Sequence, residues 1–260
     1  QLQSSAASDV YKRQTNKKLI LWTRNQDVVN SVQEIRENRL RLPGYILPQN
    51  IIVTNDINQM GNCSIILIAV PMQQLRSVVE LHRSSLEGKI LVACCKGFEV
   101  STGQGPTSIL EMASNKTAVL TGPSFAADLA SGFPTALTVA SKVEGLAQFI
   151  QSELGTETLR LYWSDDPIGA EFGGALKNVI AIGCGVTIGA GYGSSSRAAL
   201  MTRGYSEIIS IAPYFGAKPE TLSGLSGLGD LSLTCMSSES RNYRYGLALG
   251  KQQSFDKNIT

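Results

Sequence analysis

The six residues Ile65-Ile66-Leu67-Ile68-Ala69-Val70 are apolar at every position, without the alternation of a half-exposed strand. A continuous apolar run of this length is typical of a strand buried on both faces of a parallel sheet. Similar runs alternate with helical stretches between about residues 17 and 162: Leu19–Trp22, Ile51–Val53, Ile90–Ala93, Ala118–Leu120 and Leu137–Ala140. The sequence therefore predicts an α/β domain with a parallel sheet covered by helices on both faces.

Beyond Trp163 the pattern becomes helical and punctuated by glycine, with no convincing strand. This change predicts a second, all-helical domain. The boundary is expected near residues 162–165, which gives a first domain over 16–162 and a second over 163–260.

The second domain begins with a helix that carries one lysine among apolar residues and glycines. Asp165 and Asp166 supply an acidic cap, and Pro167 suits the first helical position. Large apolar side chains at helical spacing predict its buried face: Ile168, Phe172, Leu176, Val179 and Ile180.

Lys177 is expected on another face of this helix, beside Gly173, Gly174 and Ala181. These small neighbours leave room for a ligand or for another backbone. A buried lysine would have its pKa lowered from about 10.4 toward neutrality, which suits a proton donor and acceptor. The alternative is a lysine whose chain runs from a buried helix out to solvent.

Composition narrows the classes of function. The chain has 260 residues, 43% hydrophobic and 17% charged, as in a soluble globular protein. A net charge of +2 without a dense basic tract argues against a nucleic-acid binder. No apolar run predicts a membrane span, and no signal peptide is visible. Five scattered cysteines without a C-x-x-C pair indicate reduced thiols and argue against a metal site.

The single histidine, His82, follows apolar residues at helical spacing and is expected at the edge of the core. A chain with one histidine cannot easily run a Ser-His-Asp or His–metal mechanism. Acid–base chemistry therefore falls to lysine or to carboxylates.

Ligands of open parallel sheets gather at the carboxyl ends of the strands. The residues that follow the predicted strands are Arg24, Pro71, Lys96-Gly97 and Thr121–Ser124, and the last of these opens a helix with free N–H groups. Each could be ordinary loop chemistry. Two cations and an anion-binding helix start on one edge favour a phosphorylated ligand.

The strand and turn that usually begin a dinucleotide-binding unit are missing. No G-x-G-x-x-G motif precedes Leu19, and residues 1–14 contain no apolar run for a central strand. Because the first strand usually sits mid-sheet, its loss would leave a gap between its neighbours and remove the main cradle for a nucleotide phosphate. We expect residues 1–15 to be foreign to the fold, from a mis-assembled or mis-called start, which the genomic DNA upstream of Asn16 would decide.

Seven sequence blocks follow one another along the chain: Leu21-Trp22-Thr23-Arg24, Val70-Pro71, Lys96-Gly97-Phe98, Gly122-Pro123-Ser124-Phe125-Ala126, Gly173 to Gly183, Gly227-Leu228-Gly229-Asp230-Leu231 and Ser240-Arg241-Asn242. In this order and at this spacing, from about residue 16 to the end, they resemble the NAD(P)-dependent glycerol-3-phosphate dehydrogenases, especially the bacterial form. The resemblance implies a Rossmann-like domain, incomplete at its start, followed by a helical domain.

The resemblance implies catalytic roles for three residues. Lys177 corresponds to the group that takes the proton from the substrate alcohol and returns it in the reverse direction. Asp230, after Gly227 and Gly229, corresponds to a carboxylate beside that lysine, and Lys96 to a second lysine that contacts the substrate and the cofactor. Without the resemblance, Asp230 would be read as a turn former and Lys96 as a solvated loop residue.

The remaining implied sites bind substrate or cofactor. Arg241 corresponds to the arginine that binds the substrate phosphate and contacts the cofactor. An arginine suits this role because a guanidinium can make two parallel hydrogen bonds to a phosphate. The other implied substrate contacts are Gly122, Ser124, Asn178, Ser240 and Asn242, and the other implied cofactor contacts are Arg24, Pro71 and Ala126. Arg24 at a strand end favours NADP over NAD, although Asp27 could still reach a ribose.

The implied activity is the reversible oxidation of sn-glycerol 3-phosphate to dihydroxyacetone phosphate with NADP or NAD, in the cytoplasm, feeding phospholipid synthesis, in a homodimer. The chain stops at Thr260, short of the family's usual end. Two alternatives remain: a catalytically inactive fragment that at most binds a phosphometabolite, and a related ketopantoate-type reductase. The Ser240-Arg241-Asn242 block argues for a phosphate and against that reductase.

Overall fold

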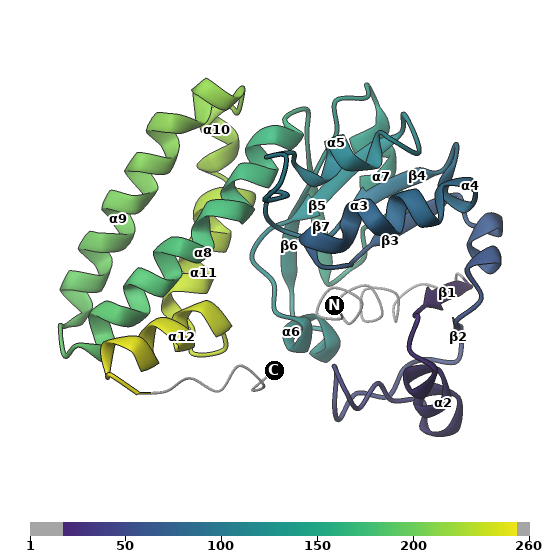
Figure 1. The fold of residues 1–260 in the computed structure, drawn as a ribbon, viewed down its shortest axis with the longest axis horizontal. Helices are drawn as coiled ribbons and strands as arrows, with labels where there is room; N and C mark the ends of the chain where they lie inside the picture. Colours follow the sequence, from purple (N-terminus) through teal and green to yellow (C-terminus); the bar gives the residue numbers. More distant parts are fainter. Residues whose placement is uncertain (1–17, 254–260) are drawn as a thin grey trace. The chain divides into compact units, whose positions relative to one another are not determined.

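The computed structural model describes residues 18–253, which form two compact units (Figure 1). The first unit contains the described residues up to Leu120 and residues 124–165, and the second contains residues 121–123 and those from Asp166 onward. The division falls three residues after the expected boundary because a strand continues to Ser164. The segment 1–15 lies outside the described residues.

The first unit holds two sheets. One pairs β1 (Leu19–Trp22) with β2 (Ile51–Thr54), in the register Leu19 to Ile51. The other has the order β3-β4-β5-β6-β7. Its strands are β3 (Ile65–Ile68), β4 (Ile90–Ala93), β5 (Thr117–Thr121), β6 (Thr135–Ala140) and β7 (Leu159–Ser164). The predicted parallel pairing is confirmed for β1–β2, β3–β4, β4–β5 and β6–β7, although the strands are divided between two sheets.

Helices follow most of these strands, as a parallel sheet requires. They are α2 (Gln26–Ile35), η2 (Ile57–Asn62), α3 (Met72–Leu81), α4 (Arg83–Leu86), α5 (Pro106–Leu110), α6 (Ala126–Ser131) and α7 (Leu146–Leu154). The larger core lies around β4 to β7 and includes Val92, Val139 and Ile150, each fully buried. A smaller core packs α2 against β1 and β2.

Strand β7 was missed by the sequence analysis, which placed the domain boundary inside it. Leu159 and Leu161 are buried, whereas Arg160 and Tyr162 are exposed. This alternation belongs to a half-covered edge strand, and within residues 18–253 β7 pairs with β6 alone. A search for continuous apolar runs does not detect such a strand.

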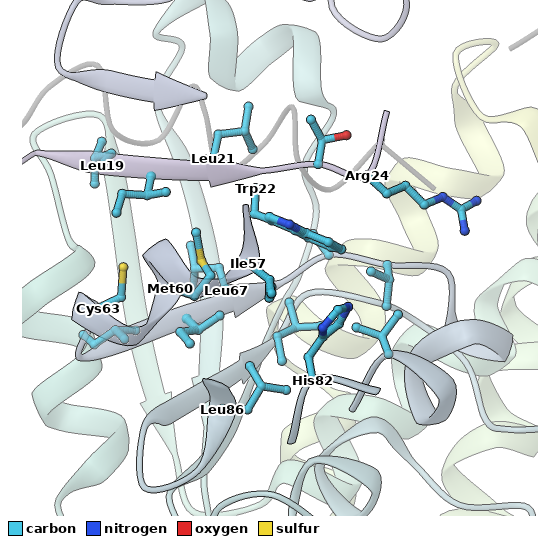
Figure 2. Close-up of a pocket in the computed structure, with 18 of the residues that line it drawn as sticks. Leu19, Leu21, Trp22, Arg24, Ile57, Met60, Cys63, Leu67, His82 and Leu86 are labelled. Carbon is cyan, nitrogen blue, oxygen red and sulfur yellow. The ribbon is translucent and has the colours of Figure 1, made fainter. Parts of the chain in front are cut away.

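The two sheets are separated by a cavity of about 650 Å³ between β1 and β3 (Figure 2). Its lining includes every residue of both strands, together with Met60 from η2 and His82 and Leu86 from the segment around α4. The cavity lies where the sequence predicted a gap for a missing central strand. His82 is half-buried, as expected, and meets Trp22 edge to face at 5.3 Å.

From Asp166 to Gln253 the described residues form helices and turns, which confirms a helical second unit. The helices are α8 (Pro167–Gly189), α9 (Ser194–Ile211), η3 (Ala212–Phe215), α10 (Pro219–Leu222), η4 (Leu225–Gly229), α11 (Asp230–Met236) and α12 (Arg241–Gly250). Helix α8 starts as predicted: the carboxylate of Asp166 caps it by accepting from the Gly169 N–H at 2.8 Å.

The predicted apolar face of α8 is buried only in part: Phe172 is buried, whereas Ile168, Leu176 and Ile180 are half-buried. Val179 is 70% exposed, and the most buried stripe is the small-residue face that carries Lys177. Neighbouring backbones approach this face closely: a Cβ on Gly173 would lie 2.5 Å from the Ser226 carbonyl oxygen, and one on Gly185 would lie 2.1 Å from that of Tyr243. The small residues therefore serve backbone packing, one of the two uses expected for them.

Among the described residues, α8 alone is long and apolar enough to cross a membrane by length and composition. This is weak evidence, because the core helix of a globular unit meets the same criteria. Helix α8 contacts α9, α11 and α12 and buries the charged side chains of Glu171 and Lys177. These contacts identify it as the core helix of the second unit.

Candidate active site

Lys177 lies inside the second unit and does not extend to solvent. Its Nζ donates to Oδ1 of Asp230 at 2.6 Å and to Oγ1 of Thr234 at 2.8 Å. The side chains of Lys177 and Asp230 are only 9% and 2% exposed. The interpretation of Lys177 as a residue that reaches for solvent is therefore wrong, and the lysine and aspartate singled out from the sequence form a buried ion pair.

Tight backbone packing places the carboxylate of this pair. Asp230 is the first residue of α11 and directly follows η4. A Cβ on Gly227 would lie 1.9 Å from the Leu222 carbonyl oxygen, so only glycine fits there. On the other side of η4, Ser226 and Gly227 approach Gly173 of α8, one turn before Lys177. The glycines thus bring the start of α11 against the lysine.

Thr234 completes this cluster and was not found by the sequence analysis. Its hydroxyl accepts from Lys177 and donates to the backbone carbonyl oxygen of Asp230 at 2.6 Å. It lies four residues after Asp230 and therefore on the same face of α11. The spacing of four residues was the sequence signal that could have placed the side chains of Thr234 and Asp230 together. The contact with Lys177 joins residues 57 positions apart, which no local pattern reveals.

The buried pair has clear electrostatic consequences. Burying two charges is costly, and their attraction offsets the cost only when the remaining hydrogen-bonding groups are also satisfied. Thr234 supplies one such group to the ammonium. The result is an amine with a fixed position beside a carboxylate, shielded from bulk water, which is the environment that proton transfer to and from an alcohol needs.

A second set of contacts joins α8 to the start of α12. The side-chain N–H of Asn242 donates to Oδ1 of Asn178 at 2.7 Å. Ser240 caps α12, its hydroxyl accepting from the Tyr243 N–H at 3.3 Å. Arg241 is therefore the exposed first residue of a ten-residue helix, at the end where backbone N–H groups and the helix dipole favour an anion.

The first unit carries the other predicted residues at the carboxyl ends of parallel strands. Arg24 follows β1 and is exposed, and Pro71 immediately precedes α3 after β3. Lys96 follows β4 and is half-buried, while Ser124 and Ala126 follow β5. The sequence analysis therefore placed these residues on the correct edge. Helix α6 starts at Ala126, two residues after Ser124, with Phe125 as its cap.

Gly122 belongs with the second unit. Its φ of 146° is in the region that favours glycine, and it begins the turn that leaves β5. Its neighbour Pro123 lies under η4, since a Cβ on Gly229 would lie 3.4 Å from the proline ring. Gly122 is thus anchored beside the segment that leads into Asp230.

Metal ligation finds no support among residues 18–253, where no group of three or more His, Cys, Asp or Glu side chains is placed to hold an ion. The five cysteines are free thiols. Cys184 and Cys235 are both buried in the cluster that joins α8 and α11. A hydrogen bond from Cys235 lowers the pKa of the Cys184 thiol, and the same bond with burial raises that of Cys235.

Comparison with known proteins gives consistent matches over both units. The model for the NAD-dependent glycerol-3-phosphate dehydrogenase N-terminus matches residues 5–147, and that for the C-terminus matches residues 166–260. The glycerol-3-phosphate dehydrogenase (NAD(P)+) of Ruegeria sp. (strain TM1040) is 53% identical over 242 residues, which are 92% of this chain and 76% of the relative. That of Roseobacter denitrificans is 51% identical with the same coverage.

Among solved structures, the glycerol-3-phosphate dehydrogenase of Coxiella burnetii is similar with a TM-score of 0.89 and 34% identity, over 96% of this chain and 77% of that one. It supports the expected fold of an α/β domain followed by a helical domain. The matches favour this enzyme family over the ketopantoate-type alternative. The chain belongs to the NAD-dependent glycerol-3-phosphate dehydrogenase family of oxidoreductases.

Proposed function

We propose that this protein interconverts sn-glycerol 3-phosphate and dihydroxyacetone phosphate with NAD or NADP, and that Lys177 moves the proton at the C2 oxygen. The observation that carries the proposal is the buried ion pair of Lys177 and Asp230, completed by Thr234. Support for the substrate comes from relatives at about half identity, named as glycerol-3-phosphate dehydrogenases.

The proton step follows from the positions of these side chains. When the ketone is reduced, the Lys177 ammonium donates a proton to the developing C2 alkoxide. When the alcohol is oxidised, the neutral amine accepts the hydroxyl proton. Asp230 favours the ammonium by charge, and burial opposes it by desolvation. The hydride is the chemistry of the nicotinamide when it is bound.

Substrate phosphate recognition is assigned to the start of α12. Arg241 offers a planar guanidinium, and the first turn of the helix offers backbone N–H groups, held by the Ser240 cap. The bond between Asn242 and Asn178 fixes this end of α12 against α8 one residue away from Lys177. This arrangement supports a substrate with its phosphate at one end and its reacting oxygen at the other.

The described residues fit a dinucleotide only in part. Arg24 at the end of β1 suits the 2′-phosphate of NADP, and Ala126 begins a helix after β5. Between β1 and β3, where a strand and a glycine-rich turn would hold the pyrophosphate, residues 18–253 leave a cavity. As they stand, these residues do not fit the pyrophosphate, so we assign no step to groups that would hold it.

The family supports three further assignments. We propose that the enzyme acts in the cytoplasm, that it supplies glycerol 3-phosphate for phospholipid synthesis, and that it works as a homodimer. Sedimentation of the purified protein tests the dimer, and glycerol auxotrophy of a strain that lacks the enzyme tests its role in supply.

The activity is tested by following NADPH oxidation with dihydroxyacetone phosphate. Two proteins are compared: the chain as given, and a restored version with the Ruegeria relative's terminal segments in place of residues 1–15 and after Thr260. We expect turnover in the restored protein and little in the chain as given. Absence of turnover in the restored protein would refute the proposed activity, and full turnover in the chain as given would show that the added segments are not needed for it.

A further inference from the structure

The loop that follows β4 is held by two side chains of helix α3. This loop contains Lys96, and α3 begins directly after Pro71. Gln73 and Arg76 lie three residues apart and therefore on one face of the helix. Both side chains make hydrogen bonds to residues 98–100, which start two residues after Lys96.

Gln73 binds the backbone on both sides of Glu99. Its side-chain N–H donates to the Phe98 carbonyl oxygen at 2.8 Å, and its side-chain oxygen accepts from the Val100 N–H at 3.0 Å. An amide side chain has one group that donates and one that accepts, so it can pair with a chain segment as the backbone of a neighbouring strand would. Removal of this one side chain would break both bonds.

Arg76 holds the side chain of Glu99, which lies between these two bonds. Its Nε donates to Oε1 at 2.9 Å, and a terminal nitrogen donates to Oε2 at 2.7 Å, as in a bidentate pair. The Glu99 side chain is only 8% exposed, and the Thr102 hydroxyl donates to the same Oε2. Because removal of one partner from a buried ion pair is costly, the carboxylate is held firmly against α3.

Lys96 lies between this bound segment and the sheet. On the sheet side, the Cys94 N–H donates to the Ile68 carbonyl oxygen at 2.9 Å and continues the pairing of β4 with β3. On the other side, Gly97 has a φ of 118°, which favours glycine, and a Cβ there would lie 3.7 Å from Cγ of Met72. A fixed backbone group therefore lies two residues from Lys96 in either direction.

The first turn of α3 also follows a predicted cofactor contact. Pro71 is the N-terminal cap of the helix, two residues before Gln73. The same helix therefore supports Pro71, expected to contact the cofactor, and the loop with Lys96, expected to contact the substrate. A shared support fixes the two residues relative to each other.

We propose that Gln73 and Arg76 are positioning residues of the dehydrogenase reaction, because they hold residues 98–100 against α3 and so fix the position of Lys96. The proposal rests on the proposed function and on the substrate contact that the family resemblance implies for Lys96. A misplacement of about 1 Å at a reacting site can cost about 10²-fold in rate. Loss of the bonds from α3 would allow the loop such a displacement.

The first test measures the mobility of Lys96 in the full chain and needs no turnover. The lysines are methylated with isotope-labelled formaldehyde, the Lys96 signal is assigned by its absence in Lys96→Arg, and its relaxation is followed by NMR. We expect Gln73→Met and Arg76→Met to increase the internal motion of Lys96. In Gln73→Met, amide exchange at Val100 should also accelerate about tenfold or more, because its acceptor is lost.

The matched control is Gln74→Met. Gln74 is the next glutamine of α3 and is likewise exposed, so the same substitution is made one position away from the bonded side chain. This variant should change neither the motion of Lys96 nor the exchange of Val100.

The second test follows steady-state kinetics in the restored enzyme. Gln73→Met and Arg76→Met should each lower kcat/KM for dihydroxyacetone phosphate about tenfold or more, and Gln74→Met should leave it unchanged. Arg76→Lys keeps the charge but not the bidentate geometry, so it should recover only part of the loss.

A double-mutant cycle separates positioning of Lys96 from a general effect on the fold. Lys96→Met alone should lower kcat/KM at least as much as Gln73→Met. In the Lys96→Met background, Gln73→Met should lower kcat/KM by less than about twofold more, because the side chain that it positions is already absent. A residue that only stabilises the fold would have the same effect in both backgrounds.

Two results would overturn the proposal: unchanged motion of Lys96 in both Gln73→Met and Arg76→Met, or equal effects of Gln73→Met with and without Lys96. Urea titration checks that each variant is folded. If Arg76→Met does not fold, the exposed Gln73 still gives the test. An inactive restored enzyme would refute the proposed reaction, whereas the NMR measurement would still decide whether α3 holds Lys96 in place.

Discussion

At the scale of single residues, Lys177 is held by two acceptors from adjacent turns of one helix. Asp230 supplies the charge, and Thr234 supplies a second oxygen that is itself fixed by a bond to the backbone of Asp230. A proton carrier needs a defined position as well as a suitable pKa, because transfer requires hydrogen-bond distance to the reacting oxygen. The cluster supplies that position.

Replacement of Lys177 should separate catalysis from stability. In the restored enzyme, Lys177→Ala removes the proton carrier, and we expect kcat to fall by about 10²–10⁴-fold. The same change leaves Asp230 buried without its partner, which should lower the free energy of unfolding by about 3–5 kcal/mol. The double variant Lys177→Met/Asp230→Asn should regain part of the lost free energy of unfolding, as measured by urea titration, but it should have no activity. An active Lys177→Ala enzyme would contradict the proton-transfer role.

Thr234 should behave as a positioning residue. Thr234→Val keeps the shape but removes the oxygen that accepts from Nζ of Lys177. A hydrogen bond to a charged group is worth about 1.5–3 kcal/mol, so we expect kcat to fall roughly tenfold or more, with little change in KM for dihydroxyacetone phosphate. Thr234→Ser should restore kcat. An equal loss in both variants would indicate a packing role only.

At the scale of elements, helices α8 and α12 meet backbone to backbone through glycines. A Cβ on Gly185 would lie 2.1 Å from the Tyr243 carbonyl oxygen, and one on Gly246 would lie 2.0 Å from that of Ile182. Gly185→Ala therefore has to push the helices apart, and we expect a net loss of about 1–3 kcal/mol despite the better helix propensity of alanine.

This displacement of α12 should also weaken the binding of the substrate. Because Arg241 and Asn242 begin α12, Gly185→Ala should raise KM for dihydroxyacetone phosphate in the restored enzyme. Gly193→Ala is the matched control, since a Cβ there would meet nothing within 4 Å. Thermal unfolding and steady-state kinetics of both variants measure the two effects. Equal behaviour of the two variants would show that the close approach has no energetic importance.

An ion pair joins α3 to the loop after β4 and predicts a dependence of stability on pH. Arg76 donates to both carboxylate oxygens of Glu99, and with the Thr102 hydroxyl it lowers the pKa of Glu99. A carboxyl group whose pKa is lower in the folded state stabilises the fold above its unfolded pKa of about 4.3. That stabilisation is lost as the pH falls through the folded value.

Glu99→Gln should therefore weaken the acid sensitivity of the protein. We expect the urea midpoint of the unmodified chain to fall more steeply between pH 6 and pH 3 than that of Glu99→Gln, and the two to converge at the acid end. Glu87→Gln, at an exposed residue, is the control. Parallel curves for the unmodified chain and Glu99→Gln would contradict a stabilising pair.

Comparison of particular elements shows what the sequence could predict. The buried strands were predicted within one to two residues because a continuous apolar run is a local signal, as in β1 and β4. Strand β7 has the weaker alternating signal of a sheet edge. The face of α8 predicted from its large apolar residues includes the buried Phe172 but also the exposed Val179. The most buried face is the one with glycines, and its burial depends on approaching backbones that a local pattern does not reveal. Thr234 depends on a contact across 57 positions.

At the scale of the whole chain, the first unit has unequal halves. The five-stranded sheet is covered by a large core in which Leu91, Val92 and Ala93 are fully buried. Strands β1 and β2 form a two-stranded sheet that rests on α2 and a small core. An isolated two-stranded sheet is marginally stable in water, so this part of the unit depends on few contacts.

Native-state hydrogen exchange should therefore give different opening free energies for the two sheets of the first unit. We expect the protected amides of β1 and β2, such as Leu19 and Ile51, to open at a free energy about 2 kcal/mol or more below that of Leu91 in β4, because they can unfold without disturbing the larger sheet. Low concentrations of urea should accelerate their exchange only slightly, as for a small local opening. If these amides instead exchange with the same free energy and urea dependence as Leu91, the two sheets unfold as one cooperative unit, and the cavity between them does not weaken their coupling.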